Sequence, residues 1–320
     1  MYKLLDLVDS IPVEPESWPH VGFVSSDRTV IMGHQHEMFL YQGTNQHYDS
    51  YFDSDLEQTA NMWAELISHR HRELTKKVPL MLSIFVPNKA TCLPLLFPQP
   101  LPRGGTVVGK SIKRLLADDP GVLFPLQDPS ISSDAMAGAW LRTDSHWSPS
   151  GCLIAVNEIL KKMALPLVQY QIATNQVEFR GDLSQKWQGR SMVEERLDLH
   201  SPELESLVPE LEYDNSEKLS EHFGRHVRWA NKKAKYPINI TIVGDSFSGP
   251  GESSRELTWW LSRLFQSVTF LHMALIPTDV VDTTSCDFLI FEITERFLPQ
   301  VPRDDLTYAQ LQKLILENHD

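Results

Sequence analysis

Three nearly continuous apolar runs constrain the possible fold of this chain more than any other feature of its sequence. They are "PLMLSIFVP" from residue 79, "INITIVG" from residue 238 and "CDFLIFEI" from residue 286, and each is bounded by turn residues. A strand that is apolar on both faces is typical of a parallel sheet with helices packed against both sides. The three runs therefore predict the buried centre of an α/β fold.

Shorter β-rich stretches and segments with helical spacing alternate with these runs. Further strands are predicted at "GFVSS" from 22, "TVIMG" from 29, "EMFLYQG" from 37, "GVLFPL" from 121 and "SVTFLH" from 267. Helices are predicted at roughly 54–76, 107–117, 149–163, 253–266 and 305–317. The first helix is expected to turn one side to the core, with Leu56, Ala60, Met62, Trp63, Leu66 and Ile67. Strands that alternate with helices indicate an α/β sandwich with a mostly parallel sheet.

The stretch from about 166 to 235 differs from the rest because it is polar, acidic and weakly periodic. Long irregular segments tend to be functional when they are ordered. We expect an insertion or a flap over one end of the sheet, inside a single domain that spans residues 1–320. We see no internal repeat and no low-complexity tract.

Charge and hydropathy argue against several classes of function. The chain has 29 Lys and Arg against 42 Asp and Glu, a formal net charge of -13. Non-specific binding to the nucleic-acid backbone is therefore not expected. No apolar run approaches the roughly 18 to 20 residues of a membrane span. The opening "MYKLLDLVDSIPVEPESW" lacks the apolar core of a secretory signal. We therefore expect a cytoplasmic protein, or a periplasmic one if the amino end has been trimmed.

The run at 238 ends in "GDSFSGPG", which places Ser246 at the carboxyl end of a predicted parallel strand. Sites in such sheets form beyond these ends, where loops and helix amino termini converge. A serine hydroxyl needs a base, and the base needs an acceptor that orients it. "WLRTDSHWSPSG" supplies Asp144 and His146, whose spacing brings both side chains to the same side of an extended or tightly turned segment. The two segments together predict a Ser-His-Asp arrangement.

Each segment also has a structural interpretation. Gly, Asp and Ser are the usual residues of turns, so an isolated "GDS" is more often a mere strand-to-helix turn. "DSHWSPSG" equally fits the start of a helix, with "SPSG" as its capping turn. Asp245 is expected to hold its own turn through side-chain to backbone bonds.

Together the segments resemble those of the alginate O-acetyltransferase family, the AlgX/AlgJ-type proteins with an SGNH-hydrolase-like domain. "RTDSHWSPSG", then "GDSFS" about a hundred residues later, and then "FEITERFL" follow that family's order, in which Asp-x-His precedes the serine. "VIMGHQHEMFLYQG" and "SIFVPNKATCLPLLFP" are similar to earlier segments of its domain. The resemblance extends from about residue 28 to 300 and is specific only at the Asp-x-His and serine motifs. It implies a three-layer α/β/α sandwich.

The resemblance also implies a two-step acyl transfer, with Ser246 as nucleophile, His146 as base and Asp144 as its orienting acid. An acetyl donor would acylate Ser246, and a carbohydrate hydroxyl would then take the acetyl group. The donor's identity, acetyl-coenzyme A included, stays open, and no tightly bound cofactor is expected. Association with polysaccharide-synthesis proteins fits this context. The alternatives are an acetylesterase, in which water takes the acetyl group, and a catalytically silent carbohydrate-binding module.

Further residues are expected near such a site. The "PNK" turn offers Asn88 as an oxyanion-hole donor beside the Ser246 NH, with Lys89 next to it as a second candidate. Arg296 is expected to pair with Glu295 or, less readily, to reach a substrate carboxylate. Four more residues are placed near a carbohydrate or an anionic substrate: Trp147, Trp187, Lys186 and Arg190.

No metal site is predicted. "HQH" at 34–36 and "HRH" at 69–71 come without a clear third ligand, and His69 and His71 are expected on the surface because positions i and i+2 diverge on a helix. The three cysteines are far apart, which indicates neither a disulfide framework nor a zinc site. Without a P-loop or GxGxxG motif, no nucleotide cofactor is implied.

Overall fold

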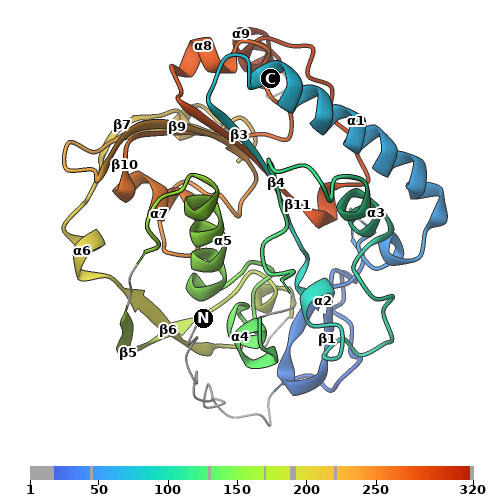
Figure 1. Ribbon diagram of the computed structural model, residues 1–320. Helices are drawn as coiled ribbons and strands as arrows, with labels where there is room; N and C mark the ends of the chain where they lie inside the picture. The colour runs from blue at the N-terminus through green and yellow to red at the C-terminus, as the bar shows by residue number, and fades with distance from the viewer. Residues whose placement is uncertain are drawn as a thin grey trace.

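The computed structural model describes residues 18–317, except 44–45, 129–130, 169–170, 188–191 and 220–221. At its centre lies a seven-stranded sheet in the order β4-β3-β11-β9-β10-β8-β7 (Figure 1). Neighbouring strands are parallel from β4 to β10 and antiparallel from β10 to β7. The mostly parallel α/β fold predicted from sequence is therefore confirmed. The strands are β3 (Leu80–Val86), β4 (Val122–Leu123), β7 (Glu210–Asp214), β8 (His226–Ala230), β9 (Tyr236–Gly244), β10 (Phe265–His272) and β11 (Phe288–Thr294).

The three apolar runs form β3, β11 and β9, which are adjacent at the middle of the sheet. β3 and β11 pair in register from Leu80 opposite Phe288 to Val86 opposite Thr294. β9 continues this register on the other side of β11, through Val243 opposite Phe291. Since the strands are parallel, their carboxyl ends meet at one edge, and the residues that follow each strand converge there.

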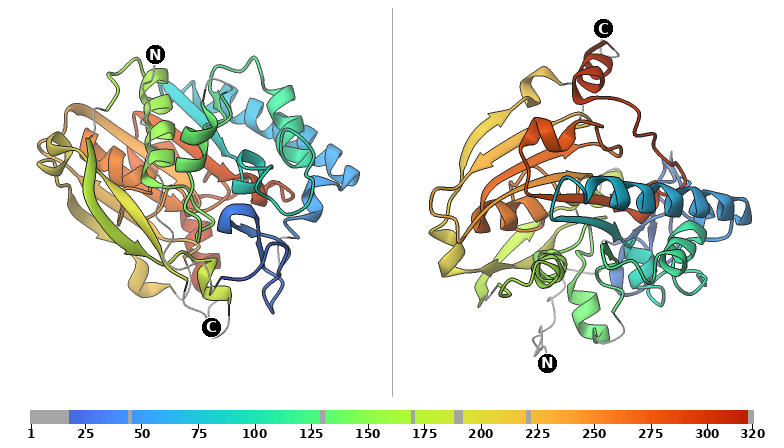
Figure 2. Two further views of the ribbon diagram at one scale, coloured as in Figure 1. Left: turned by 90° about the horizontal axis from the view of Figure 1, so that it is seen from below. Right: turned by 45° about the horizontal axis from the view of Figure 1, so that its top comes forward.

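Helices cover both faces of this sheet (Figures 1 and 2). α5 (Pro149–Lys162) and α7 (Leu257–Leu264) share one apolar core with Ile84 and Ile242 of the sheet. α1 (Glu57–Leu74) and α3 (Val107–Leu115) share the other with Phe85 and Phe291. α8 (Val280–Thr284) and α9 (Tyr308–Glu317) contribute to that second core. None of the described helices combines the length and apolar character needed to cross a membrane.

α1 corrects two of the sequence predictions. Met62, placed on the buried face, is 51% exposed, and His71, expected on the surface, has a side chain that is only 12% exposed. The buried face instead includes Arg70, which is tolerated because Asp304 accepts two hydrogen bonds from its guanidinium at 2.5 and 2.8 Å.

The stretch from 166 to 235 contains four strands that its polar sequence did not predict. β5 (Gln171–Phe179) and β6 (Glu194–His200) form a separate antiparallel pair on the side of the sheet that carries α5 (Figure 2). β7 and β8 extend the central sheet itself. The part of this stretch that joins the edge of the sheet is thus not a flap, and its polar side chains fit an exposed edge.

The remaining elements are short. β1 (Val30–Met32) and β2 (Met38–Leu40) form a two-stranded antiparallel sheet, and "GFVSS" contributes only an isolated bridge from Val24 to Ile31 rather than a strand. The other described helices are α2 (Lys89–Cys92), α4 (Ser133–Gly138) and α6 (Pro202–Glu205), with 3-10 turns at His34–His36, Asp49–Tyr51, Ser54–Leu56, Ser184–Lys186, Ser216–Lys218 and Glu295–Phe297.

Candidate active site

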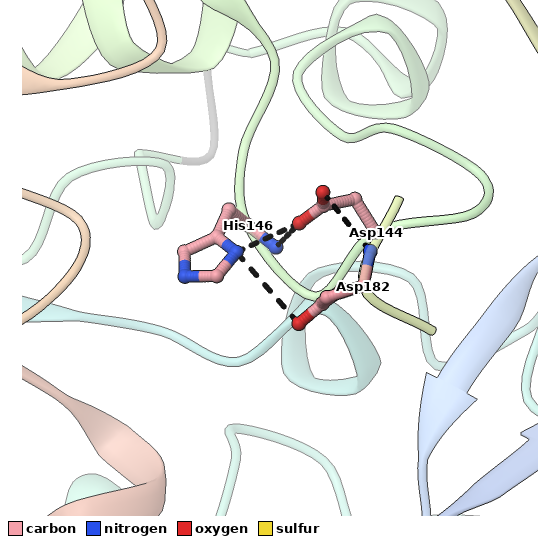
Figure 3. A group of neighbouring side chains, drawn as sticks. All are labelled: Asp144, His146 and Asp182. Atoms are coloured by element: carbon pink, nitrogen blue, oxygen red, sulfur yellow. Dashed lines mark hydrogen bonds and ion pairs between the residues drawn. The ribbon is translucent and has the colours of Figure 1, made fainter. Parts of the chain in front are cut away.

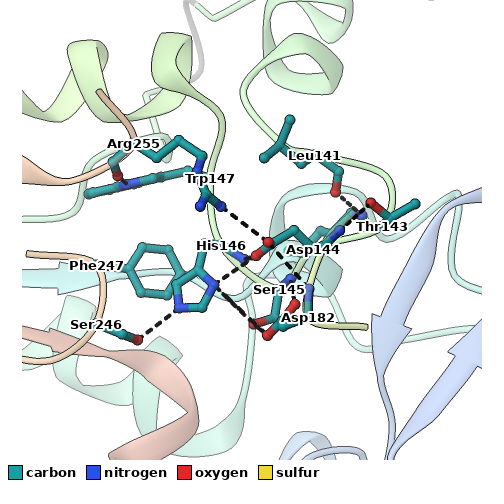
Figure 4. A network of polar contacts seen from close by, with 12 residues as sticks. Leu141, Thr143, Asp144, Ser145, His146, Trp147, Asp182, Ser246, Phe247 and Arg255 are labelled. Atoms are coloured by element: carbon teal, nitrogen blue, oxygen red, sulfur yellow. Dashed lines mark hydrogen bonds and ion pairs between the residues drawn. The ribbon is translucent and has the colours of Figure 1, made fainter. Parts of the chain in front are cut away.

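The structure brings together Ser246, His146 and Asp144 (Figure 4). The imidazole Nε2 of His146 lies 2.8 Å from Ser246 Oγ, and its Nδ1 lies 2.7 Å from Asp144 Oδ1. Both distances are those of good hydrogen bonds. The bond from His146 to Ser246 connects two segments that lie a hundred residues apart in the sequence. The arrangement can pass a proton from the serine hydroxyl to an imidazole that a carboxylate orients.

Ser246 follows β9 in a turn that Asp245 fixes. One oxygen of Asp245 accepts from the Phe247 NH at 2.9 Å, and the other accepts from the NH and hydroxyl of Thr294 at 2.8 and 2.6 Å. Asp245 therefore has the turn-holding contacts expected for it. The neighbouring Ser246 NH has no acceptor among the described residues, so it can bind an incoming oxygen.

Asp144 and His146 lie immediately before α5. Ser148 caps this helix by accepting from the Gly151 NH, and Pro149 is its first residue, so "SPSG" is the helix start that the structural interpretation predicted. Asp144 Oδ1 also accepts from the His146 NH at 2.8 Å, which folds the segment into a tight turn. The capping turn and the His-Asp contact thus coexist in one segment.

Arg255 donates to the second oxygen of Asp144, at 3.1 Å. Burial by itself would raise the pKa of Asp144, but the hydrogen bond and charge of His146, with Arg255 next, outweigh it and hold this pKa well below its ordinary value. The carboxylate is therefore ionised at neutral pH and can stabilise a positive charge on the imidazole.

Buried charged groups hold the segment that precedes His146. Glu194 of β6 accepts from the NH groups of Arg142 and Thr143, both at 2.9 Å, and from the Thr143 hydroxyl. Lys89 donates to the carbonyls of Leu141 and Arg142 at 2.6 and 3.0 Å. Two long-range clamps therefore set the position of the turn that carries Asp144.

Lys89 does not face a substrate. Its side chain is 4% exposed, and its ammonium pairs with Glu37 at 2.6 Å and also donates to the Met38 carbonyl. These internal contacts replace the oxyanion or substrate role that was expected from sequence, and they make Lys89 a positioning residue for the Asp144 turn.

Asp182 is a second carboxylate beside the imidazole (Figure 3). It lies 3.9 Å from His146 Nδ1 and accepts from the NH and hydroxyl of Ser145 at 2.7 and 2.6 Å. Burial and the negative charge of Asp144 raise the pKa of Asp182. Asp144, His146 and Asp182 also present ligand atoms within 4.8 Å of one another, a spacing that a metal ion could use. Each atom already has a hydrogen-bond partner, which accounts for the cluster without an ion.

Trp147 and Trp187 are buried rather than placed for stacking on a sugar. Trp147 is fully buried, its indole NH donates to the Arg255 carbonyl, and its ring packs edge-on against Phe247 with centroids 5.0 Å apart. Trp187 is 6% exposed and packs in the small core under β1 and β2. The exposed Lys186 lies 3.7 Å from Asp27, and Arg190 lies outside the described residues.

A cavity of about 230 Å³, measured as space open to the centre of a water molecule, adjoins Ser246 and His146. Sequence analysis missed most of its wall, which includes His222, Arg225, Arg255, Glu252, Glu256 and His272. His272 ends β10, so the strand-end rule that found Ser246 would also have found it. The others lie in turns, and only the folded chain brings them together.

Asn88 and Arg296 line a second, smaller cavity. The expected pairing of Arg296 with Glu295 is wrong, because Glu295 instead accepts from the Asn88 NH at 2.8 Å and the Thr106 NH at 2.6 Å. Arg296 turns the other way and donates to Ser246 Oγ at 3.4 Å and Ser145 Oγ at 3.2 Å. The side chain of Asn88 is buried, and its amide nitrogen has no hydrogen-bond partner among the residues that the structure describes.

No family model and no curated protein matches this sequence. Solved structures do. The O-acetyltransferase domain of Pseudomonas putida AlgJ matches with a TM-score of 0.53 and 16% identity, over 89% of this chain and 99% of that one. Bacillus cereus PatB1 matches with a TM-score of 0.56 and 10% identity, over 85% and 97%. A DHHW family protein from Eubacterium siraeum matches with a TM-score of 0.51 and 12% identity, over 86% and 96%.

This chain shares their fold. The match to AlgJ covers nearly the whole of that domain, so the fold that the sequence resemblance implied is the one observed. Identities of 10 to 16% establish architecture and no more.

Proposed function

We propose that this protein is a serine-dependent O-acyltransferase that moves an acetyl group to a carbohydrate hydroxyl through an acyl-Ser246 intermediate. The observation that carries the proposal is the continuous hydrogen-bond path from Ser246 through His146 to Asp144, at 2.8 and 2.7 Å, beside an open cavity. The fold shared with a domain described as an O-acetyltransferase supports this reaction class.

In the first step Ser246 Oγ attacks the carbonyl carbon of the acetyl donor while His146 Nε2 takes the hydroxyl proton. The tetrahedral species collapses to acetyl-Ser246, and the imidazolium gives its proton to the leaving group. Asp144 keeps Nδ1 as the protonated nitrogen, which leaves Nε2 free to accept, and its negative charge stabilises the imidazolium. In the second step a sugar hydroxyl attacks acetyl-Ser246, its proton passes to His146, and Ser246 is released with its hydroxyl restored.

The acceptor sugar would enter through the 230 Å³ cavity, because Ser246 and His146 both open into it. The acetyl donor, acetyl-coenzyme A or another activated ester, would use the same opening in turn. Because the two substrates would share one opening, we expect the donor to react and leave before the acceptor enters, with an acyl-enzyme as the intermediate. Association with polysaccharide-synthesis proteins belongs to the same proposal and follows from the family resemblance.

The decisive experiment measures p-nitrophenol release from p-nitrophenyl acetate by wild type, Ser246→Ala and Ser68→Ala. Ser68 is exposed on α1, away from the proposed site, and serves as the matched control. We expect Ser246→Ala to lose about 10⁴-fold or more in kcat, as nucleophile removal does in serine enzymes, and Ser68→Ala to match wild type. Mass spectrometry of the intact protein should find an added acetyl group on wild type and Ser68→Ala and none on Ser246→Ala. Equal rates for wild type and Ser246→Ala would reject catalysis and favour a silent binding module.

A second experiment separates transfer from hydrolysis, which use the same residues. The protein is incubated with an acetyl donor and a panel of glycans, and the glycans are weighed by mass spectrometry. Acetylated glycan in the wild-type reaction, absent with Ser246→Ala, is the expected result. Hydrolysis of the donor with no modified glycan across a broad panel would assign the protein as an acetylesterase.

A further inference from the structure

The charge of Arg296 has no carboxylate partner in the part of the chain that the structure describes. Its guanidinium donates to the hydroxyls of Ser246 and Ser145, and it lies over two aromatic rings, Phe247 at 5.4 Å and Phe297 at 5.1 Å. The rings and the two hydroxyls fix its position without neutralising it. A half-buried cation held in this way beside a nucleophile is ready to bind a negative charge.

Arg296 also lines a small cavity whose wall combines polar side chains with Leu40, Ala90 and Leu183. Its wall includes Asn88 and His47, each 4% exposed. Within the described part of the chain, Asn88 Nδ2 and His47 Nδ1 are buried and have no hydrogen-bond partner. Buried polar atoms are rarely left unpaired, because each costs about 1 to 3 kcal/mol. The cavity measures about 10 Å³ on the same scale as the larger one, which is room for roughly one water-sized group.

Arg296 supplies the uncompensated positive charge of this cavity. Lys89 also lines it, but Glu37 balances that charge at 2.6 Å. Burial, and after it the charge of Arg296, lowers the pKa of His47 to about 3, so the imidazole is neutral. Among the described residues that line this cavity, Arg296 is therefore the cation that no carboxylate balances, and its charge is available to an oxygen that becomes negative beside Ser246.

We propose that Arg296 is a catalytic residue whose guanidinium binds the carbonyl oxygen of the acetyl group as that oxygen becomes negative, together with the Ser246 NH. This inference rests on the proposed function. The oxygen lies one bond from the carbon that Ser246 Oγ attacks, and Arg296 Nη2 is 3.4 Å from that Oγ, so the guanidinium is within reach of the charge where it develops. An arginine fork, rather than amide groups alone, would thus form the oxyanion hole.

The first test compares wild type, Arg296→Met, Arg296→Lys and Arg228→Met in hydrolysis of p-nitrophenyl acetate. Arg228 is a half-exposed arginine of β8 paired with Glu212 at 3.0 Å, and its replacement is the control. We expect Arg296→Met to lose about 10² to 10³-fold in kcat with little change in KM, Arg296→Lys to lose less, and Arg228→Met to match wild type. Loss confined to anionic esters, with normal turnover of this neutral one, would make Arg296 a carboxylate-binding group and overturn the proposal.

A second measurement distinguishes charge binding from mere positioning of Ser246. The same variants are compared on p-nitrophenyl thionoacetate, in which sulfur replaces the carbonyl oxygen. Sulfur accepts hydrogen bonds weakly, so the ratio of wild-type to Arg296→Met rates should shrink markedly with this ester. An equal ratio for both esters would mean that Arg296 only holds Ser246 in place.

The possible results distinguish failure of this inference from failure of the proposed function on which it rests. Activity that needs Ser246 but survives Arg296→Met would overturn the role of Arg296 alone. A wild type no faster than Ser246→Ala would overturn the acyl-serine function and this inference together. Because Arg296→Met could lower folding stability, thermal unfolding of each variant is measured, and Arg296→Lys preserves a cation at the site.

Discussion

Arg255 Nη1 lies 3.1 Å from Asp144 Oδ2, the carboxylate oxygen that His146 does not use. One carboxylate therefore has a cation on one oxygen and the imidazole on the other. Arg255 also lines the cavity that opens on Ser246. Its charge helps to keep Asp144 ionised. A residue of the cavity wall therefore influences the carboxylate that orients His146.

Replacement of Arg255 by methionine should move the acidic limb of kcat/KM to higher pH. The imidazole of His146 must be free to take the proton of Ser246, and loss of the neighbouring cation makes it easier for the hydrogen-bonded Asp144-His146 pair to hold an extra proton instead. Activity should therefore disappear at a higher pH than in wild type as the solution is acidified, while rates near pH 8 differ less. Profiles of p-nitrophenyl acetate hydrolysis would record this, and superimposable acidic limbs would contradict it.

The two carboxylates beside His146 should differ sharply in importance. Asp144 is 2.7 Å from Nδ1 and Asp182 is 3.9 Å from it, with Asp182 bound mainly to Ser145. Asp144→Asn should lower kcat by about 10⁴-fold, because an amide can present the wrong partner to Nδ1 and favour the wrong tautomer. Asp182→Asn should lower it far less. Comparable losses in the two variants would show that the carboxylates share the orienting role.

The centre of this fold was readable from sequence because its signals are local. The runs at 79, 238 and 286 are apolar on both faces, which only a doubly covered strand explains. Ser246 was found because a strand end is visible in the sequence, and Asp144 and His146 because they are two residues apart. Each of these signals is contained in one short segment.

The parts that were missed depend on contacts between distant segments. Lys89 was expected beside the oxyanion or the substrate, and its partner Glu37 comes from a distant part of the sequence. Arg296 and Glu295 are neighbours in sequence, yet they point to different partners because a 3-10 turn begins at Glu295. Edge strands such as β7 carry polar side chains, so hydropathy does not distinguish them from loops.

A second set of Ser, His and Asp in the same molecule shows that hydrogen bonds among these residues do not by themselves make a catalytic site. His71 contacts Asp119 through Nδ1 at 2.8 Å and Ser83 through Nε2 at 2.9 Å, the same order of atoms as around His146. Ser83 is fully buried in β3, so no substrate carbonyl reaches its hydroxyl. Access to a cavity, which Ser246 has, is the difference between the two sets.

Ser83→Ala should therefore leave ester hydrolysis unchanged, while His71→Phe should cost about 1 to 3 kcal/mol of unfolding free energy by leaving the Ser83 and Asp119 groups unpaired. Urea unfolding and p-nitrophenyl acetate turnover, measured on the same preparations, would test both statements. A large loss of kcat in folded Ser83→Ala would mean that this second set takes part in the chemistry.

Loss of Lys89 alone should destabilise the fold more than loss of Lys89 and Glu37 together. Lys89→Met leaves Glu37 in the interior with only Arg142, at 3.7 Å, near its charge, which costs up to about 3 to 5 kcal/mol. The double variant Lys89→Met with Glu37→Leu should recover part of that loss, though three carbonyls still lose the hydrogen bonds that Lys89 donated. Lys232→Met, at a 90% exposed side chain, should change unfolding free energy by no more than about 0.5 kcal/mol. A single variant as stable as the double one would refute the pairing argument.

Glu292 gives a prediction about stability and pH. Its side chain is fully buried under the Ser246 turn, where Oε2 accepts from the Asp245 NH at 3.1 Å and the Ser248 hydroxyl at 2.9 Å. Burial, reinforced by the negative charge of Asp245, raises the pKa of Glu292 well above its ordinary 4.5. The folded protein thus holds a proton that the unfolded chain releases above about pH 4.5, so this group's contribution to stability falls as pH rises from there toward the folded-state pKa.

Glu292→Gln removes that titration and keeps an oxygen to accept the same two hydrogen bonds. The variant's unfolding free energy, relative to wild type, should therefore rise as the pH increases from about 5 toward the folded-state pKa in a series of urea unfolding curves. Glu292 Oε1 has no hydrogen-bond partner among the described residues, so the added amide hydrogens need not break an existing bond there. A difference between variant and wild type that stays constant across this range would mean that Glu292 is ionised in the folded protein, and that the turn carrying Ser246 tolerates two negative charges.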